Sequence, residues 1–233
     1  YSLINSYEEE ITRFDHKRKA NGYVEEISYD SEGDKLYRLE VKEDYTKLLQ
    51  TFDKGTMLYE ELLRPSGHNR RTSFNESGQK VFELIITKDY KRTLEIFNDE
   101  VLVYEDILKP NGYRQQQSFD PDGNKLYRIE LKEDHTRTIE VFTDGTKTYE
   151  EILNPDGSRI EKVGENGDSY TLNRSKDGTT NINVNTGNIK ITLDSNGTFS
   201  LTATDDINID TSSNVNINAS SNVNVQASAI NLN

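Results

Sequence analysis

The chain of 233 residues has no cysteine, no tryptophan and a single methionine, and only 32% of its residues are hydrophobic. The absence of cysteine excludes disulfides and thiolate chemistry. No apolar run approaches the roughly 18 residues of a membrane span, and there is no signal-peptide pattern. The chain is too polar to build a large monomeric core, so its composition favours self-assembly.

Positive charge is also scarce. The net charge is −13, and residues 178–233 hold one of the 28 basic side chains and four of the 41 acidic ones. Nucleic-acid binding needs a surface rich in Lys and Arg, and so does lasting adhesion to an anionic bilayer. We therefore expect no nucleic-acid partner and no stable membrane insertion. The simplest interpretation of the acidic charge is that it keeps a β-rich protein soluble.

Low hydrophobicity with a high net charge is typical of disorder, but a strict period of 45 residues argues against it. Three copies span residues 14–58, 59–103 and 104–148, and the chain begins inside an earlier copy without an initiator Met. That start predicts that the chain is part of a longer protein. The residues that coincide between copies include Gly22, Gly67 and Gly112; Gly33, Gly78 and Gly123; Lys35, Lys80 and Lys125; and Phe52, Phe97 and Phe142.

Within each copy, strand signals alternate with turn signals. The run 35–42 alternates so that Tyr37, Leu39 and Val41 share one face. Segments 30–33, 75–78 and 120–123 combine Asp or Asn with Gly, as tight turns require. Turns about every eleven residues predict four strands per copy. The expected fold is an all-β antiparallel meander, with β-branched and aromatic residues on one face and Lys, Glu and Arg on the other.

Four strands per 45 residues also describe a β-propeller blade. Three full copies are too few for a closed propeller, and the fourth copy decays after Gly157. We therefore expect residues 1–163 to form an extended acidic shaft, followed by a transition segment at 164–180. The repeats also resemble, weakly, hairpin repeats called MORN-like or YD-like, from which we take no function.

Residues 181–233 carry a second period, in which two apolar residues flanking a polar one recur about every eight positions. Each octad offers too few apolar side chains to offset about 1–2 kcal/mol of backbone entropy per residue, so several copies of the chain must share one core. Three ribbons closed around an axis also leave no sheet edge. The predicted core of this needle is Ile182, Val184, Ile189, Ile191, Phe199, Leu201, Ile207, Ile209, Val215, Ile217, Val223, Val225, Ile230 and Leu232.

The segment 205–233, DDINIDTSSNVNINASSNVNVQASAINLN, resembles the triple-stranded β-helix of phage tail cell-puncturing spikes and of VgrG proteins in type VI secretion, and the resemblance covers roughly residues 180–233. Many members of that family have Gly at corners where this chain has Ser-Ser-Asn. The resemblance implies an intertwined homotrimer at the centre of a contractile baseplate, which pierces the target cell envelope. A generic Asn-rich β-solenoid in a tail fibre is the alternative.

The resemblance also implies partners and a location. Baseplate hub proteins would bind through a region upstream of this chain, and a PAAR-like protein could cap the tip. The protein would belong to the virion tail baseplate or to an extracellular injection apparatus. A rival function from another class is a trimeric tail fibre or adhesin that binds a cell-surface carbohydrate, which exposed Tyr and Phe would favour.

We find no arrangement typical of an enzyme, a metal site or a cofactor site. Adjacent acids at 60–61, 105–106 and 150–151 recur with the repeat, whereas a glycosidase pair is one unique constellation. His16, His68 and His135 occupy three different repeat positions without ligand spacing. Segment 120–124 lacks the distant bidentate Glu of a calcium loop, so we interpret it as a turn. We expect no catalytic residue, no metal and no cofactor.

Overall fold

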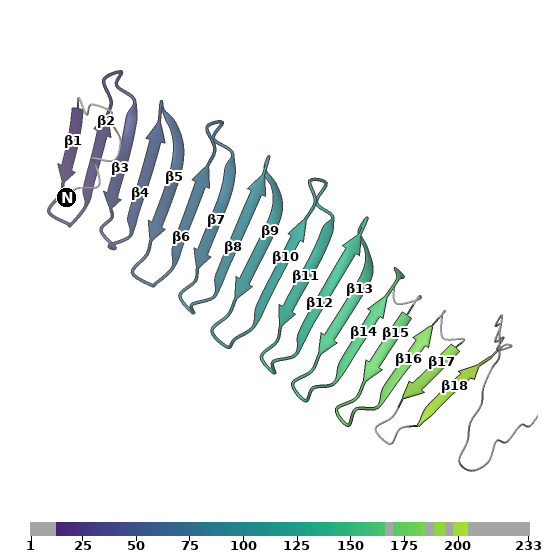
Figure 1. Cartoon of the computed structure of the whole chain (residues 1–233). Helices are drawn as coiled ribbons and strands as arrows, with labels where there is room; N and C mark the ends of the chain where they lie inside the picture. The colour runs from purple at the N-terminus through teal and green to yellow at the C-terminus, as the bar shows by residue number, and fades with distance from the viewer. Residues whose placement is uncertain (1–12, 166–169, 185–188, 194–197, 205–233) are drawn as a thin grey trace, which may run out of the picture.

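The computed structural model describes residues 13–165, 170–184, 189–193 and 198–204. All its regular elements are β-strands (Figure 1). They are β1 (Arg13–Arg18), β2 (Val24–Tyr29), β3 (Lys35–Val41), β4 (Lys47–Asp53), β5 (Thr56–Leu63), β6 (Asn69–Phe74), β7 (Lys80–Ile86), β8 (Arg92–Asn98), β9 (Val101–Leu108), β10 (Arg114–Phe119), β11 (Lys125–Leu131), β12 (Arg137–Thr143), β13 (Thr146–Leu153), β14 (Arg159–Val163), β15 (Tyr170–Arg174), β16 (Thr180–Val184), β17 (Ile189–Leu193) and β18 (Phe199–Ala203).

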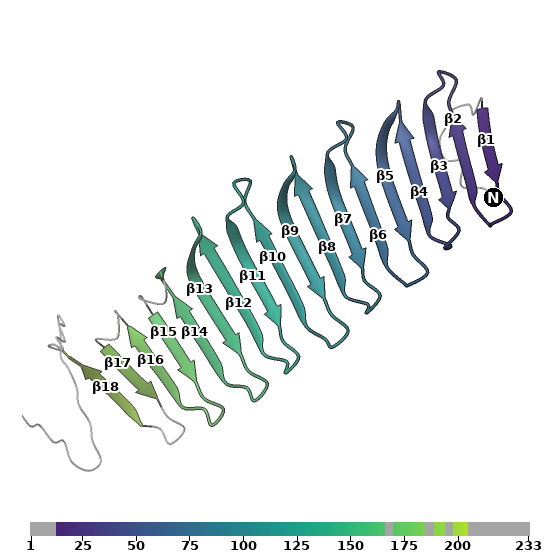
Figure 2. The ribbon, with the colours of Figure 1, turned by 180° about the vertical axis from the view of Figure 1, so that it is seen from behind.

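The strands form one antiparallel sheet of 18 strands, in which each strand pairs with the strands before and after it. The predicted all-β antiparallel meander is therefore confirmed, with four strands in each 45-residue copy. The sheet is open and one layer thick, and no other element of the described residues covers either face (Figures 1 and 2). The four-strand units consequently do not close into propeller blades.

The turns at 30–34, 75–79 and 120–124 are built alike, and they confirm the turn signals. In the third, the Asp120 carboxylate accepts hydrogen bonds from the backbone N–H groups of Asp122 and Asn124 at 2.9 and 2.8 Å, and Gly123 has a φ of 83°. The Asn124 side chain, followed by these backbone groups, holds the pKa of Asp120 below its ordinary value. This segment is thus a turn in which the carboxylate is engaged by the chain itself.

Other turns reach a positive φ without glycine. Between β3 and β4, Tyr45 has a φ of 63°, and the equivalent residues of the next two copies, Tyr90 and His135, have φ values of 62° and 65°. In each case the N–H of this residue donates to the carbonyl three residues earlier, at 2.9 to 3.0 Å. Bulky residues seldom adopt this conformation, because Cβ then crowds the following carbonyl.

The sheet continues past the third copy into the octads. Strand β15 lies inside the expected transition segment and pairs with β14, and β16, β17 and β18 follow in the same antiparallel order. Of the predicted needle core, six residues fall on these strands. Ile182 is opposite Ile191, Ile191 is opposite Leu201, and Val184 is opposite Ile189, while Phe199 begins β18. The remaining predicted core residues, Ile207 to Leu232, lie outside the described residues.

The positive φ of Gly123 predicts a stability effect that depends on the backbone alone. A Cβ added there would meet nothing within 4 Å, so Gly123→Ala should lower the free energy of unfolding by about 1 kcal/mol through left-handed backbone strain. Urea denaturation measures the loss. The control is Asp122→Ala in the same turn, which leaves the backbone bonds to Asp120 intact. Equal losses in both variants would show that φ does not govern this turn.

Candidate interaction surface

One face of the sheet carries an apolar stripe along its length. We call this the apolar face and define it by Tyr37, Leu39 and Val41 of β3 and by the residues that the strand register places on the same side. Register pairs such as Leu39–Leu49 and Leu84–Leu94 carry the stripe from strand to strand. The middle row of the stripe contains Leu39, Leu49, Leu84, Leu94, Ile129, Ile139, Leu172, Ile182, Ile191 and Leu201.

No element of the described residues covers this face. None of their hydrophobic side chains is buried. Of the 13 large hydrophobic residues that are exposed, all but Tyr45, Tyr90 and Leu126 belong to the apolar face. Those ten are Phe14, Leu63, Ile96, Leu108, Leu131, Val141, Leu153, Val163, Phe199 and Leu201. Exposed apolar residues recur on this face along the described strands, so the face is the strongest candidate for an interface.

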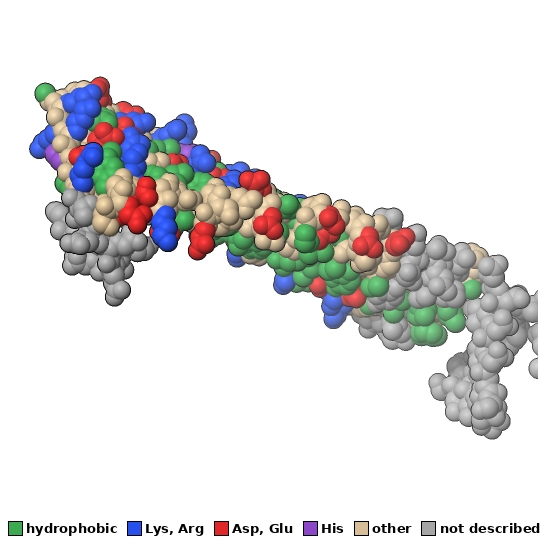
Figure 3. Space-filling view, turned by 90° about the horizontal axis from the view of Figure 1, so that it is seen from above, with side chains coloured by type: hydrophobic (Ala, Val, Ile, Leu, Met, Phe, Trp, Pro, Cys, Tyr) green, Lys and Arg blue, Asp and Glu red, His purple; other side chains and the backbone are tan. Residues whose placement is uncertain are grey.

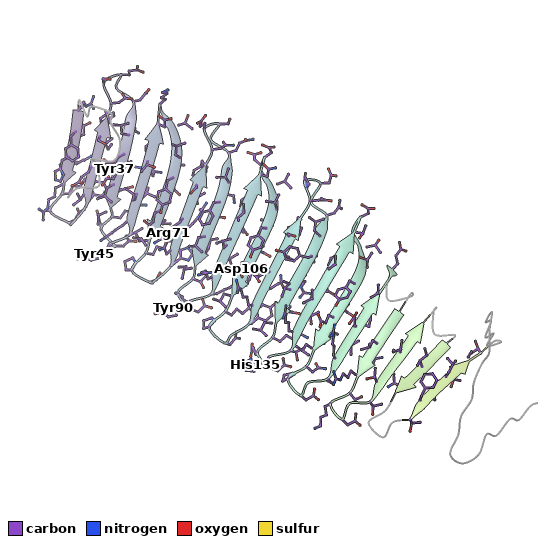
Figure 4. The ribbon with its side chains drawn as sticks, viewed as in Figure 1. Tyr37, Tyr45, Arg71, Tyr90, Asp106 and His135 are labelled. Atoms are coloured by element: carbon purple, nitrogen blue, oxygen red, sulfur yellow. The ribbon has the colours of Figure 1, made fainter. Side chains whose placement is uncertain are left out.

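Ion pairs interrupt the apolar stripe once in every repeat. Arg71 Nε lies 2.7 Å from Glu61 Oε1, and Arg114 Nη2 lies 2.8 Å from Asp106 Oδ2, with Asp106 only 6% exposed. Figure 4 places Arg71 and Asp106 in the middle of the sheet. The prediction that Lys, Glu and Arg would occupy only the opposite face is wrong at these columns. They are tolerated there because each acid has a basic partner on the neighbouring strand.

The adjacent acids noted in the sequence do not act as pairs. Glu60 is opposite Thr72 and Glu61 is opposite Arg71, so the two carboxylates point to opposite faces of β5. The same alternation separates Glu105 from Asp106. A catalytic carboxylate pair must flank one reacting bond, and this geometry cannot provide it.

The opposite face, which we call the charged face, carries a row of carboxylates across β7, β8 and β9. Glu95 is directly opposite Glu83 on one side and Glu105 on the other. Burial first, then the charges of Glu83 and Glu105, raise the pKa of the Glu95 carboxyl. Burial also opposes ionisation of Glu83, but hydrogen bonds from Lys80 at 3.1 Å and Arg70 at 2.7 Å lower its pKa overall.

The charged face is not purely polar. A second row beside the carboxylates includes Leu48, Leu62, Ile85, Ile107, Ile152 and Ile160. Long charged side chains flank this row, and one of them, Arg38, bonds Glu25, Gln50 and Glu40 on three strands. The aliphatic stems of such side chains cover apolar surface while their ends stay in water. This face is therefore better suited to solvent than the apolar face.

The three histidines stay far apart. His16 Nδ1 lies 3.3 Å from Glu26 Oε1, His68 belongs to the turn before β6, and His135 belongs to the turn before β12. Among the described residues, no group of three or more His, Cys, Asp or Glu side chains could hold a metal ion. The same residues include no helix long and apolar enough to cross a membrane.

Sequence reasoning missed the aromatic residues at the turn tips. Tyr45 is 75% exposed and Tyr90 is 78% exposed, and Figure 4 shows both, with His135, along one long edge of the sheet. The sequence did contain a signal for them. A turn without glycine follows a strand every 45 residues, and each of these turns contains Asp-Tyr or Asp-His.

Comparison with known proteins adds little to this surface. No protein-family model matches the chain, and neither does any curated protein. Among solved structures, an E1021V mutant of the TCP10 domain of Danio rerio CPAP has 15% identity and a TM-score of 0.37, over 75% of this chain and 90% of that one. The SAS-4 TCP domain of Drosophila melanogaster, in complex with a proline-rich motif of Ana2, has 13% identity and a TM-score of 0.35, over 81% and 88%. Scores this low carry no functional argument.

The carboxylate row predicts opposite effects for two neighbouring residues. The pKa of the Glu95 carboxyl is raised in the folded protein, so ionised Glu95 destabilises the fold. This destabilisation is absent below the pKa that Glu95 has in the unfolded chain, and it grows as pH rises through the pKa in the folded chain. Glu95→Gln should therefore raise the free energy of unfolding near pH 7 by about 0.2–1 kcal/mol, the range of cross-strand pairs. The gain should vanish at acidic pH in urea titrations.

Glu83→Gln is the matched comparison and should lower stability near pH 7. The pKa of Glu83 is lowered, so its ion pairs stabilise the fold above the unfolded pKa and are lost as pH falls through the folded one. The two variants should converge at acidic pH. The same sign for both at neutral pH would contradict the assigned roles of Glu83 and Glu95.

Proposed function

We propose that this protein is the central spike of a phage tail baseplate, or of a related contractile injection machine, and that it works as a homotrimer. The observation that carries the proposal is the uncovered apolar face, whose register continues from the repeats into the first octad strands. The family resemblance of segment 205–233 supplies the mechanical role. In this role the protein is no enzyme and needs no cofactor.

In this proposal, three ribbons with their apolar faces turned inward form the shaft. A strand of seven residues is about 23 Å long, so three such sheets around an axis lie about 7 Å from it. Packed sheets are about 10 Å apart, and side chains from three faces therefore meet near the axis. Along that axis, 18 strands at about 4.8 Å give a shaft of about 80 Å before the remaining octads.

The spike sits in the virion baseplate or in an extracellular injection apparatus. Baseplate hub proteins hold it at one end, and a PAAR-like protein can cap the other. When the sheath contracts, the rod is driven into the target cell envelope. Trimerisation spreads the axial load over three chains, and the acidic surface disfavours nucleic acid and anionic lipid.

The second candidate function is a trimeric tail fibre or adhesin that binds a cell-surface carbohydrate. The exposed Tyr45 and Tyr90 favour it, because tyrosine rings offer an apolar surface with a polar end. Glycan binding by the trimer that is lost on replacing both tyrosines would select this function over the spike.

The trimer predicts a definite mass and shape. Light scattering coupled to small-angle scattering should give three times 26.7 kDa and an elongated profile, because no described hydrophobic side chain is buried in the single chain. A compact monomer would overturn the shared core and with it the spike.

The apolar face can be tested against the charged face with matched variants. Leu84→Asn with Leu94→Asn places two amides on the apolar face, whereas Ile85→Asn with Thr93→Asn places them on the charged face. The first pair should raise the dissociation constant of the trimer at least tenfold, because buried polar groups without partners are costly. The second pair should leave assembly nearly unchanged, as measured by light scattering during dilution. Equal effects would mean that the apolar face is not turned inward.

The octads can be tested in the same way. Val215→Asp with Ile217→Asp should abolish needle assembly, because buried charges without partners are not accommodated. Asn216→Asp, between them in the sequence, places its charge at a position predicted to face outward and should assemble normally. An unchanged trimer in the first variant would refute the inward positions of Val215 and Ile217.

A further inference from the structure

The sheet has two long edges made of turns, and the turns alternate between them. We call the turns 30–34, 53–56, 75–79, 98–101, 120–124 and 143–146 the upper edge, as drawn in Figure 1. The turns 19–23, 42–46, 64–68, 87–91, 109–113, 132–136 and 154–158 form the lower edge.

The two edges differ in charge. The upper edge contains ten acidic side chains and one lysine, whereas the lower edge contains seven basic and six acidic ones. Figure 3, which looks down on the upper edge, shows acidic groups at intervals along it and hydrophobic groups gathered on one side. This asymmetry is a separate observation, because the charged residues of these turns are not among those that define the apolar face.

On the lower edge, each of the six acids is engaged within its own chain. Asp44, Asp134 and Asp156 accept backbone N–H bonds from Thr46, Thr136 and Ser158, each at 2.9 Å. The other three bonds run from Asn21 to Glu43, from Thr87 to Asp89 and from Asn111 to Glu133.

The lower-edge cations are not neutralised in this way. Within the part of the chain that the structure describes, no ion pair is formed by Lys42, Arg64, Lys88, Lys91 or Lys132. On the upper edge the same holds for Glu32, Asp53, Glu76, Asp99, Glu100, Asp122 and Asp144. The lower edge thus presents cations that form no ion pair, although Lys42, Lys88, Lys91 and Lys132 lie near acids of their own turns, and the upper edge presents anions that form no ion pair.

The lower edge also carries the exposed aromatics. Tyr45 and Tyr90 occupy a backbone conformation that costs about 1–2 kcal/mol for a residue with Cβ, at positions where glycine would carry no such cost. The two rings are 75% and 78% exposed in the single chain. A contact that buries them would offset the cost of the strained backbone. Backbone outliers of this kind concentrate at functional sites.

The occupant follows from the geometry of a closed trimer. When three parallel ribbons surround an axis with the same face inward, the lower edge of each must lie beside the upper edge of the next, a head-to-tail contact that closes after three copies. The turn 87–91 and the turn 98–101 are separated by one strand, so in neighbouring copies they lie at nearly the same height. Lys88, Tyr90 and Lys91 of one copy then face Asp99 and Glu100 of the next.

We propose that the lower edge of each copy docks on the upper edge of a second copy of this chain, forming a seam of ion pairs that also covers Tyr45 and Tyr90. This inference rests on the proposed trimer and deepens it by naming the contacting edges and their order. Charges set the pairing of edges, since two upper edges brought together would repel each other. The aromatic rings supply the apolar contact of the seam.

Crosslinking tests the seam in the full chain, which contains no cysteine of its own. Lys88→Cys with Asp99→Cys places one thiol on each edge, too far apart across β8 for a link within one chain. A short bismaleimide should then give covalent dimers and trimers on a denaturing gel. Lys88→Cys alone and Asp99→Cys alone are the controls and should give only monomers, because neither edge meets its own copy.

The outcomes separate the seam from the trimer itself. If the double variant is a trimer by light scattering but gives only monomers on the gel, the seam proposal is wrong and the trimeric spike proposal is unaffected. Crosslinked dimers from either single variant would also overturn it, since like edges would then be in contact. A protein that scatters as a monomer would remove both proposals.

Radical footprinting gives an independent readout of the aromatic contact. Tyr45 and Tyr90 should be protected severalfold in the trimer and become reactive in the Leu84→Asn, Leu94→Asn variant once it is monomeric. Full reactivity of both rings in an intact trimer would refute their burial in the seam and favour the carbohydrate-binding alternative.

Discussion

The antiparallel register is the constraint on which the rest of this structure depends. Each strand hydrogen-bonds to its neighbours in sequence, and side chains alternate between two faces except at a β-bulge near one end of six strand pairs. A slip of one residue in any strand would move that strand's apolar residues to the opposite side. Held over 18 strands, the register gathers apolar residues that are far apart in the chain onto one surface.

A sheet of one layer cannot fully bury the apolar side chains that lie on one of its faces. The backbone groups are satisfied within the sheet, yet the apolar face has no second layer to pack against. The domain therefore differs from ordinary β-proteins, which bury such a face between two sheets or within a barrel. Most apolar side chains of this face are only partly buried, by their neighbours in the sheet, and the proposed trimer would bury them further.

In the proposed trimer, the ion pairs on the apolar face, Glu61–Arg71 and Asp106–Arg114 among them, would limit how copies can pack. A purely apolar repeat would pack almost as well after a shift of one 45-residue copy. A shifted packing would leave buried charged groups without their partners, which is unfavourable. Buried polar pairs can therefore specify the register of packing, although they lower stability compared with apolar residues. The three copies are not identical at these columns, since Arg71 corresponds to Glu26 in the first copy and to Gln116 in the third.

Much of the fold could be predicted from the chain alone. Alternating runs such as 35–42 and turn segments such as 120–123 are local signals, because strand periodicity and the need of glycine for positive φ act over a few residues. They were enough to determine an antiparallel meander of four strands per copy. The octad positions from Ile207 onward, and the needle they predict, remain predictions of the sequence.

Only the tertiary structure decided which features meet. Local periodicity does not show that Glu61 would join the apolar face with Arg71 as its partner, because this depends on the pairing of β5 with β6. Nor does it show that Tyr45 and Tyr90 are exposed in the single chain. Exposure depends on what covers the sheet. Like the pairing of strands, it is a property of the whole assembly of strands rather than of any segment.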